Sequence, residues 1–176
     1  MTASLLLVDG SEQPDLSRSP AFVESVSEKV FDDLTWLAAQ ICCTPVALLN
    51  LLSDDHAWLK SKVGLSADEA VRDFALPNHA VARRELLLVN DAWEDERFAK
   101  TPLVAGEMKI RFYAGMPLIS PAGKALGVLS VLDRSPRQLS AEQIYALEVL
   151  ARQITAQLEW RLKDRRDSQQ PWLCEF

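Results

Sequence analysis

The sequence lacks the features that mark membrane-spanning and secreted proteins. No apolar run in its 176 residues approaches the length of roughly 20 residues that a transmembrane helix needs. The stretch from Leu5 to Val8 is too short for a signal-peptide core, and no Lys or Arg precedes it. Only three cysteines are present, and Cys42 and Cys43 are adjacent, so we expect reduced thiols rather than a disulfide framework. These absences predict a cytoplasmic protein with no membrane partner.

Positive charge is also scarce. The chain has 19 Lys and Arg against 25 Asp and Glu, which gives a net charge of -6. Phosphate groups repel such a surface, so we expect no nucleic-acid partner. Hydrophobic residues make up 48% and charged residues 25%, the balance of a globular domain, and the length suits a single one.

The usual catalytic and metal-binding motifs are missing as well. No G-x-S-x-G sequence occurs, which argues against a serine hydrolase. Gly123-Lys124 is not a phosphate-binding loop, because Leu118 stands where the first glycine belongs. His56 and His79 are isolated, so no zinc spacing is present. We therefore predict no enzyme and no metal site, and the cofactor stays unknown.

Hydrophobic spacing predicts a long helix at each end of the domain and strands between them. The first helix begins at Ser19-Pro20, carries an apolar stripe to Ile41 and ends before Thr44-Pro45. The last begins at the capping-box sequence from Ser140 to Gln143. The strands are predicted at 46–52, where Asn50 alone interrupts an apolar run, and at 57–63, 85–89, 111–119 and 125–132. A short helix is predicted at 78–84 and a long acidic loop at 90–108.

This element order predicts an α/β fold of the α+β sandwich type. Tight hairpins require antiparallel pairing, so we expect a central antiparallel sheet of five or six strands flanked by helices. Gly127 inside a strand indicates a close backbone or side-chain approach. We predict a flexible arm at 1–19, one domain at 20–163 and a tail at 164–176.

Several segments resemble the GAF family, in particular the sensors found beside bacterial histidine kinases and diguanylate cyclases. The resemblance covers roughly residues 22–162 and is carried by these stretches: Phe31-Asp32-Asp33-Leu34, Val89-Asn90-Asp91-Ala92, Asp95-Glu96-Arg97-Phe98-Ala99, Pro102-Leu103-Val104, the run from Ile110 to Leu118, and the run from Gly123 to Arg134. It implies a GAF/PAS-like fold with a pocket between one sheet face and residues 66–84 and 90–110. It also implies a homodimer through the first and last helices.

Six residues are candidates for ligand binding in the implied pocket: Trp58, Asn78, His79, Asp91, Arg111 and Tyr113. Arg111 and Tyr113 alternate on one strand face and can hold an anionic or aromatic ligand, or Arg111 can anchor the acidic loop through Asp91, Asp95 or Glu96. His79 can donate to a ligand or bind haem iron, or simply pack beneath the loop. Trp58 and Trp93 are either pocket walls or ordinary packing.

Three better-known activities of the family are disfavoured by the residues present. Cys42 and Cys43 end a helix, which does not match the cysteines of the free methionine sulfoxide reductases. Leu76-Pro77-Asn78 replaces the cysteine that attaches a bilin. The stretch from Asn90 to Phe98 lacks the lysine and trailing acidic pair of the cyclic-nucleotide binders.

The resemblance therefore predicts a stand-alone cytoplasmic sensory module that binds a small organic ligand. It would signal through its terminal helices to a partner such as a histidine kinase or cyclase. The alternative is a ligand-free dimerisation or scaffold module, and a methionine sulfoxide reductase is a less favoured third.

Overall fold

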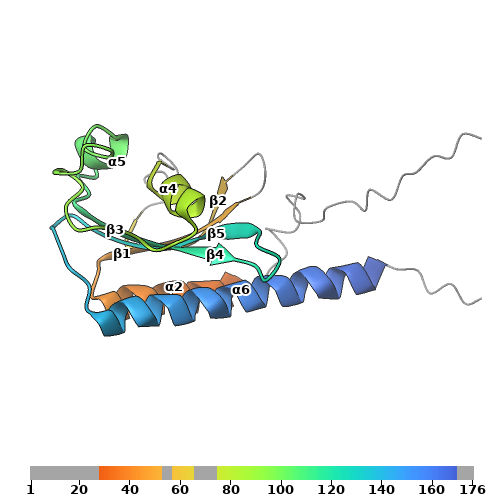
Figure 1. Ribbon diagram of the computed structural model, residues 1–176. Coiled ribbons are helices and arrows are strands. Elements are labelled where there is room, and N and C mark those ends of the chain that lie inside the picture. The colour runs from red at the N-terminus through yellow and green to blue at the C-terminus, as the bar shows by residue number, and fades with distance from the viewer. Residues whose placement is uncertain (1–27, 53–56, 66–74, 170–176) are drawn as a thin grey trace, which may run out of the picture.

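A computed structural model describes residues 28–52, 57–65 and 75–169 of the chain. A five-stranded sheet lies between two layers of helices (Figure 1). In chain order the elements are α2 (Glu28–Cys42), β1 (Val46–Leu52), β2 (Ala57–Val63), α4 (Ala75–Arg83), β3 (Leu87–Val89), α5 (Pro102–Ala105), β4 (Phe112–Ile119), β5 (Ala125–Asp133) and α6 (Ala141–Gln169). The predicted fold class, an antiparallel sheet flanked by helices, is confirmed.

The strand order in the sheet is β2-β1-β5-β4-β3, with every neighbouring pair antiparallel. β1 and β5 lie at the centre, which explains why their sequences are almost wholly apolar and buried. The β4–β5 hairpin closes through a turn in which the Gly123 amide donates to the Ser120 carbonyl at 2.8 Å. Gly123 adopts a φ of +78°, a conformation that glycine takes without steric cost.

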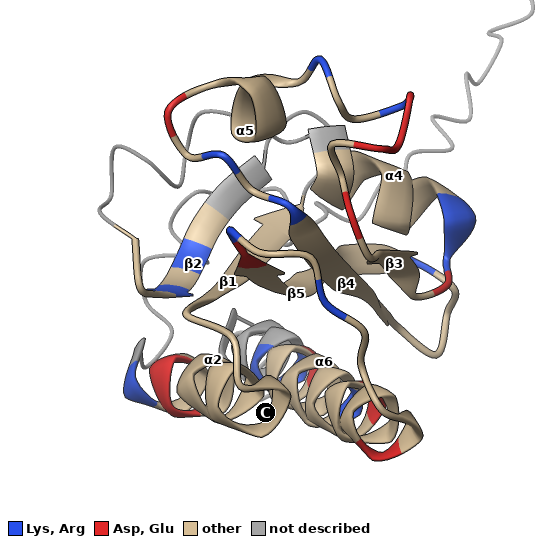
Figure 2. Ribbon diagram, turned by 90° about the vertical axis from the view of Figure 1, so that its left-hand side faces the viewer, with Lys and Arg blue, Asp and Glu red and all other residues tan. Residues whose placement is uncertain are grey.

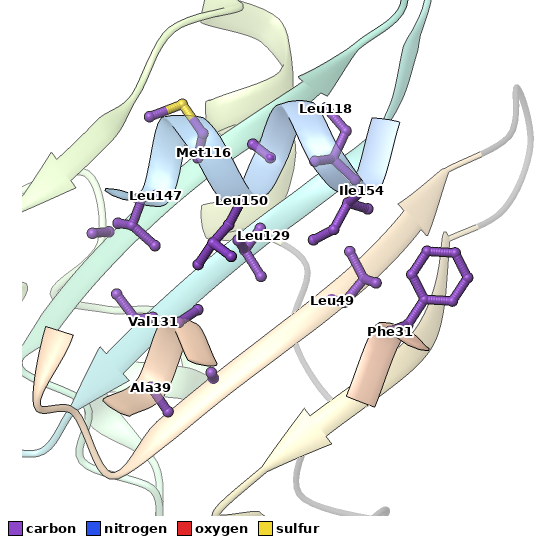
Figure 3. Packing of buried hydrophobic residues seen from close by; sticks show 14 of the residues in the cluster. Phe31, Ala39, Leu49, Met116, Leu118, Leu129, Val131, Leu147, Leu150 and Ile154 are labelled. Carbon is purple, nitrogen blue, oxygen red and sulfur yellow. The ribbon is translucent and has the colours of Figure 1, made fainter. Parts of the chain in front are cut away.

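One face of the sheet is covered by α2 and α6, which lie side by side beneath it (Figure 2). α2 packs on β1 and β2, while α6 packs mainly on β4. Leu147, Leu150 and Ile154 of α6 point toward Leu129 and Val131 of β5 and belong to one continuous apolar cluster, the helix-side core (Figure 3). Their spacing of three and four residues is what places them on one face of α6.

The opposite face of the sheet carries α4, α5 and the segment around them (Figure 1). Leu76 and Ala80 of α4, Phe98 of the following segment, and Leu103 and Val104 of α5 pack with the sheet as a second cluster, the α4-side core. Along β4 and β5 successive residues therefore alternate between two cores. The sheet therefore separates the two cores.

α6 begins with the capping box that the sequence predicts. The Gln143 amide N–H donates to the Ser140 hydroxyl at 3.3 Å, and the Ser140 N–H donates to Gln143 Oε1 at 2.9 Å. Gln143 Nε2 also donates to the Ile41 carbonyl at 3.0 Å, which ties the start of α6 to the end of α2.

Replacing Ser140 with alanine removes the hydroxyl that satisfies a free helix N–H. We expect the free energy of unfolding to fall by about 1 kcal/mol, measured by urea denaturation. Ser135→Ala, in the same connection and equally exposed but outside the helix cap, is the control and is expected to change stability by less than about 0.5 kcal/mol. Equal losses in the two variants would contradict the capping role.

The structure changes some of the predicted boundaries. The loop predicted at 90–108 contains the short helix α5, because Pro102 suits a first helical turn. β3 spans only Leu87–Val89, and α4 begins at Ala75 rather than at residue 78. α6 continues past residue 163, where we expected the tail to begin. The predicted arm at 1–19 and the start of the first helix lie outside the described residues.

Candidate functional site

Three polar side chains are buried in the α4-side face of the sheet. They are Asn50 of β1, Ser130 of β5 and Tyr113 of β4, which are 2%, 0% and 1% exposed. Strand register places Ser130 opposite both Leu48 and Gly115, and Asn50 opposite Val128. We call Asn50, Tyr113 and Ser130 the buried polar cluster.

Two atoms of this cluster have no hydrogen-bond partner. Asn50 Oδ1 and the Tyr113 hydroxyl are both fully buried and unpaired, and among the described residues only one other buried side-chain atom shares this state. The Ser130 hydroxyl donates to the Leu48 carbonyl at 3.4 Å. Burial raises the pKa of the Tyr113 phenol, and the Ser130 hydroxyl opposes this shift in part, although the two hydroxyls do not meet the geometry of a hydrogen bond. Buried polar groups are nearly always paired in folded proteins, so these two mark a place where a partner belongs.

Glycines and a bulge hold this cluster in place. A Cβ on Gly115 would lie 2.4 Å from the Tyr113 hydroxyl, so the phenol runs along β4 over a residue that has no side chain. A Cβ on Gly127 would lie 2.2 Å from the Asn50 carbonyl oxygen, so β1 approaches β5 closely at that point. The β1–β2 register also shifts between Leu49 and Asn50. Bulges of this kind re-aim side chains and are common beside functional sites.

Of the six residues predicted from the sequence, the structure brings Asp91 and Arg111 together. Arg111 Nε donates to Asp91 Oδ1 at 2.6 Å, and Arg111 Nη2 donates to the other carboxylate oxygen. The Asp91 carboxylate also accepts from the Trp93 amide at 3.1 Å. Arg111 was predicted either to bind a ligand or to anchor the acidic loop. The geometry agrees with the anchor, because two guanidinium nitrogens already donate to the Asp91 carboxylate.

This ion pair predicts an acid-sensitive contribution to stability. The Arg111 guanidinium, with help from the Trp93 amide, holds the pKa of the Asp91 carboxyl below its usual range. A carboxyl whose pKa is lower in the folded chain stabilises it above the unfolded pKa and loses that effect as pH falls through the folded value. Asp91→Asn is therefore expected to be less stable than the parent at pH 7, and the difference should be smaller at pH 3, below the unfolded pKa of about 3.9. Urea titrations at both pH values measure this, and a constant difference would contradict it.

The remaining predicted residues lie around the cluster. Asn78 and His79 are exposed on α4, and the His79 ring packs edge-on against Phe98 with 5.1 Å between ring centroids. Trp58 lies in β2 opposite Leu51, and its side chain is outside the described part of the chain. Trp93 is 58% exposed, with the Arg111 guanidinium 6.0 Å from its ring centroid.

The acidic segment after Trp93 is braced in the same way as the Asp91 region. Arg97 bonds Asp95 with two side-chain contacts, at 2.9 Å and 2.6 Å. The Arg97 guanidinium also lies 4.8 Å from the centroid of the Phe98 ring. The two arginines next to this face are therefore both engaged with neighbouring carboxylates.

The two described cysteines, Cys42 and Cys43, lie away from the buried polar cluster. Cys42 is buried in the helix-side core, where burial and the neighbouring Cys43 raise its pKa to about 11. A thiol with this pKa is almost wholly protonated at neutral pH and is a poor nucleophile. Within the described residues no three His, Cys, Asp or Glu side chains are grouped to hold a metal ion. No helix in the described part of the chain has the length and apolar character to cross a membrane.

Asn50 and Ser130 were not among the predicted site residues. The signal for Asn50 was present, because a single amide interrupts an apolar strand that is buried on both faces. Ser130 likewise interrupts the apolar sequence of β5. A small hydroxyl is common in strands, however, and only the register places it next to the Tyr113 phenol.

The arrangement matches a known family of domains. The family model for the GAF domain matches residues 27–158, which is well over half of the chain. The chain belongs to the GAF domain family. This GAF domain is therefore a sensory or regulatory module, as its sequence resemblance implied.

Relatives of this GAF domain occur in signalling proteins. A cyclic di-GMP phosphodiesterase of Pseudomonas aeruginosa is 36% identical over 137 residues, which cover 77% of this chain and 23% of that protein. The chain thus spans less than a quarter of the length of this curated relative.

Solved structures share the fold at lower identity. A domain of a candidate two-component sensor histidine kinase from Sinorhizobium meliloti 1021 has a TM-score of 0.68 and 18% identity, covering 81% of this chain and 97% of that one. A type II free methionine-R-sulfoxide reductase from Thermoplasma acidophilum has a TM-score of 0.64 and 13% identity, covering 79% and 96%. At these identities the likeness shows the fold alone.

Proposed function

We propose that this GAF domain binds a small organic molecule on its α4-side face and passes the change through the sheet to α2 and α6. The observation that carries the proposal is the pair of buried, unpartnered atoms, Asn50 Oδ1 and the Tyr113 hydroxyl. Each such atom costs free energy in the unliganded protein, and a ligand that pairs with it recovers that energy.

The layered architecture supports the second half of the proposal. Residues of β5 alternate between the two cores, so Val128 and Ser130 face the proposed site while Leu129 and Val131 pack against the helices. A displacement of β5 on the site face is therefore transmitted directly to Leu147 and Ile154 of α6. A ligand shifts the helices only as far as it prefers one of their arrangements.

The proposed output partner is suggested by the proteins in which similar domains occur. The named relatives are a cyclic di-GMP phosphodiesterase and a sensor histidine kinase. We propose that α6 leads the signal to an enzyme of second-messenger turnover or to a kinase, within a longer chain or in a separate protein. In this proposal the domain itself carries no catalysis, since the Cys42 thiol is buried on the helix side.

Mass spectrometry of the purified domain under native and denaturing conditions tests ligand binding. We expect extra mass that is released on denaturation. Hydrogen exchange of the same preparation, before and after ligand removal, tests transmission. We expect faster exchange after removal both in α4 and in α6. A change confined to α4 would contradict signalling through the helices, and the absence of any bound or added ligand would contradict sensing.

A second function, dimerisation, is favoured by the distribution of exposed apolar side chains. Among the described residues the exposed large hydrophobic side chains are Trp36, Leu37, Ile41, Trp93, Tyr145 and Trp160, and all but Trp93 lie on α2 or α6. An open groove of about 670 Å³ also lies beside α6. It is lined by α6 from Glu148 to Glu159, by the end of β4 and by residues 84–86. Exposed aromatic clusters of this kind mark interaction surfaces, and we propose that a second copy covers them.

Substitutions of exposed tryptophans test this interface. Trp36→Glu and Trp160→Glu place a charge on the proposed helix surface and are expected to convert a dimer to a monomer in sedimentation velocity. Trp93→Glu is the matched control, because Trp93 is similarly exposed but lies on the other side of the sheet. A parent protein that sediments as a monomer, or equal effects of the three substitutions, would contradict the interface.

A further inference from the structure

Charge is sparse on the described strands beneath the site, and it is concentrated at the edge. The edge strand β2 carries Lys60 and Lys62, and Lys62, paired with Leu48, is exposed on the site face. β1, β3 and β4 contain no charged residue, and the only one in β5 is Asp133 at its end. Figure 2 shows the corresponding strands without blue or red between the two helix layers, apart from that end of β5. Asp133 is itself held by Arg137 and by the Ser135 amide at 2.9 Å.

Two arginines that border this face are paired with carboxylates. The Arg111 guanidinium forms a salt bridge with Asp91, and the Arg97 guanidinium forms one with Asp95. An anionic ligand held by either arginine would have to displace the carboxylate already bound there, and burying an unpaired charge is strongly unfavourable. This geometry counts against the anionic ligand that Arg111 alone suggested.

The hydrogen-bonding chemistry of the two unpaired atoms is complementary. Asn50 Oδ1 is a carbonyl oxygen and accepts, so it calls for a donor. The Tyr113 hydroxyl donates, and its neighbour Ser130 already donates its own proton to Leu48. Asn50 Oδ1 requires an N–H or O–H on the ligand, and an acceptor oxygen or nitrogen elsewhere on the ligand would take the Tyr113 proton.

The register indicates where such a molecule lies. β5 separates β1 from β4, so Asn50 and Tyr113 stand two strand spacings apart, about 10 Å between the strand axes. The phenol runs from Tyr113 over Gly115, toward the end of the sheet where Asn50 lies, which shortens the gap. Val128 and Ser130 of β5 lie between the two strands on this face, and a molecule of about one or two rings is long enough to bridge that distance.

We infer that the ligand of this domain is an uncharged amide or lactam that donates to Asn50, accepts from Tyr113 and rests on Val128 of β5. This inference rests on the proposed sensing function and specifies its ligand class. The amide group supplies both donor and acceptor without charge, and the apolar remainder of the ligand matches the α4-side core.

Matched pairs of an amide and its carboxylate test the assignment. The probes are nicotinamide with nicotinate and quinaldamide with quinaldate, titrated into the domain and followed by thermal shift and calorimetry. We expect at least one amide to bind and its carboxylate to bind about tenfold more weakly or not at all. Asn50→Leu and Tyr113→Phe should each weaken amide binding about fivefold. Ser61→Ala, a buried hydroxyl bonded to Asp32 on the helix side, should leave binding unchanged.

Three outcomes overturn the assignment: a carboxylate that binds as tightly as its amide, amide binding that is equal in the parent and both variants, or no binding of either amide. Gly115→Ala keeps the phenol but displaces it, and it should weaken amide binding as Tyr113→Phe does. Native mass spectrometry separates this failure from failure of the proposed function. A bound anion would refute the ligand class and keep the sensing function, whereas a preparation without ligand that also binds no probe would refute both.

Discussion

Replacing Gly127 with alanine is expected to destabilise the domain by about 3 kcal/mol or more, because the added methyl group would meet the backbone of the neighbouring strand. The new Cβ would lie 2.2 Å from the Asn50 carbonyl oxygen and 3.1 Å from the Leu51 Cα. Both are backbone atoms of a central strand, so no side chain can rotate away. β1 and β5 must separate where they support both cores, and urea denaturation measures the loss.

Gly123→Ala is the matched control for this prediction. Gly123 also has a conformation that alanine adopts with strain, at φ +78°, but a Cβ there would meet only Arg84 Nη1 at 3.7 Å. We expect a loss of about 1–2 kcal/mol, because only the backbone strain is added. A smaller loss for Gly127→Ala than for Gly123→Ala would show that β1 and β5 separate easily, which would contradict a rigid wall between the two cores.

Periodicity and turn residues were sufficient to predict most of this fold. The strand at 46–52 has no alternation, and the structure buries it on both faces between the two cores. Ser140 and Gln143 predicted the start of α6 to the residue, because a capping box is a local motif. Gly127 predicted a close approach, which the structure places at Asn50. The helix α5 was missed because four residues are too few for a periodic signal.

The site was harder to predict because it depends on pairing between distant strands. Arg111 and Asp91 were both selected from the sequence, yet only the fold shows that they bind each other. Tyr113 was selected for its face, whereas its missing partner depends on Ser130 and Gly115, which register brings beside it. Asn50 could be recognised as the single polar residue in an apolar strand, but the sequence does not show whether its side chain has a hydrogen-bond partner.

Replacing Tyr113 with phenylalanine is expected to have opposite effects on stability and on ligand binding. The hydroxyl is buried without a partner in the described structure, so its removal eliminates a desolvation cost and should raise the free energy of unfolding by about 1 kcal/mol. The same removal deletes the donor that we assign to ligand recognition, so the thermal shift produced by ligand should fall. Urea denaturation of the ligand-free protein and thermal shift with the amide probes measure the two effects separately.

Ser61→Ala provides the contrast, because its hydroxyl is equally buried but donates to Asp32 Oδ1 at 2.5 Å. Losing a hydrogen bond to a carboxylate should lower stability by about 1–2 kcal/mol. The gain from Tyr113→Phe should also be constant below about pH 10, because burial raises the pKa of the phenol and both folded and unfolded chains keep it protonated there. If Tyr113→Phe instead loses stability as Ser61→Ala does, the hydroxyl has a partner within the fold, most directly Ser130. The Tyr113 hydroxyl would then be a structural group that stabilises the fold, and it would not be evidence for a ligand on the α4-side face.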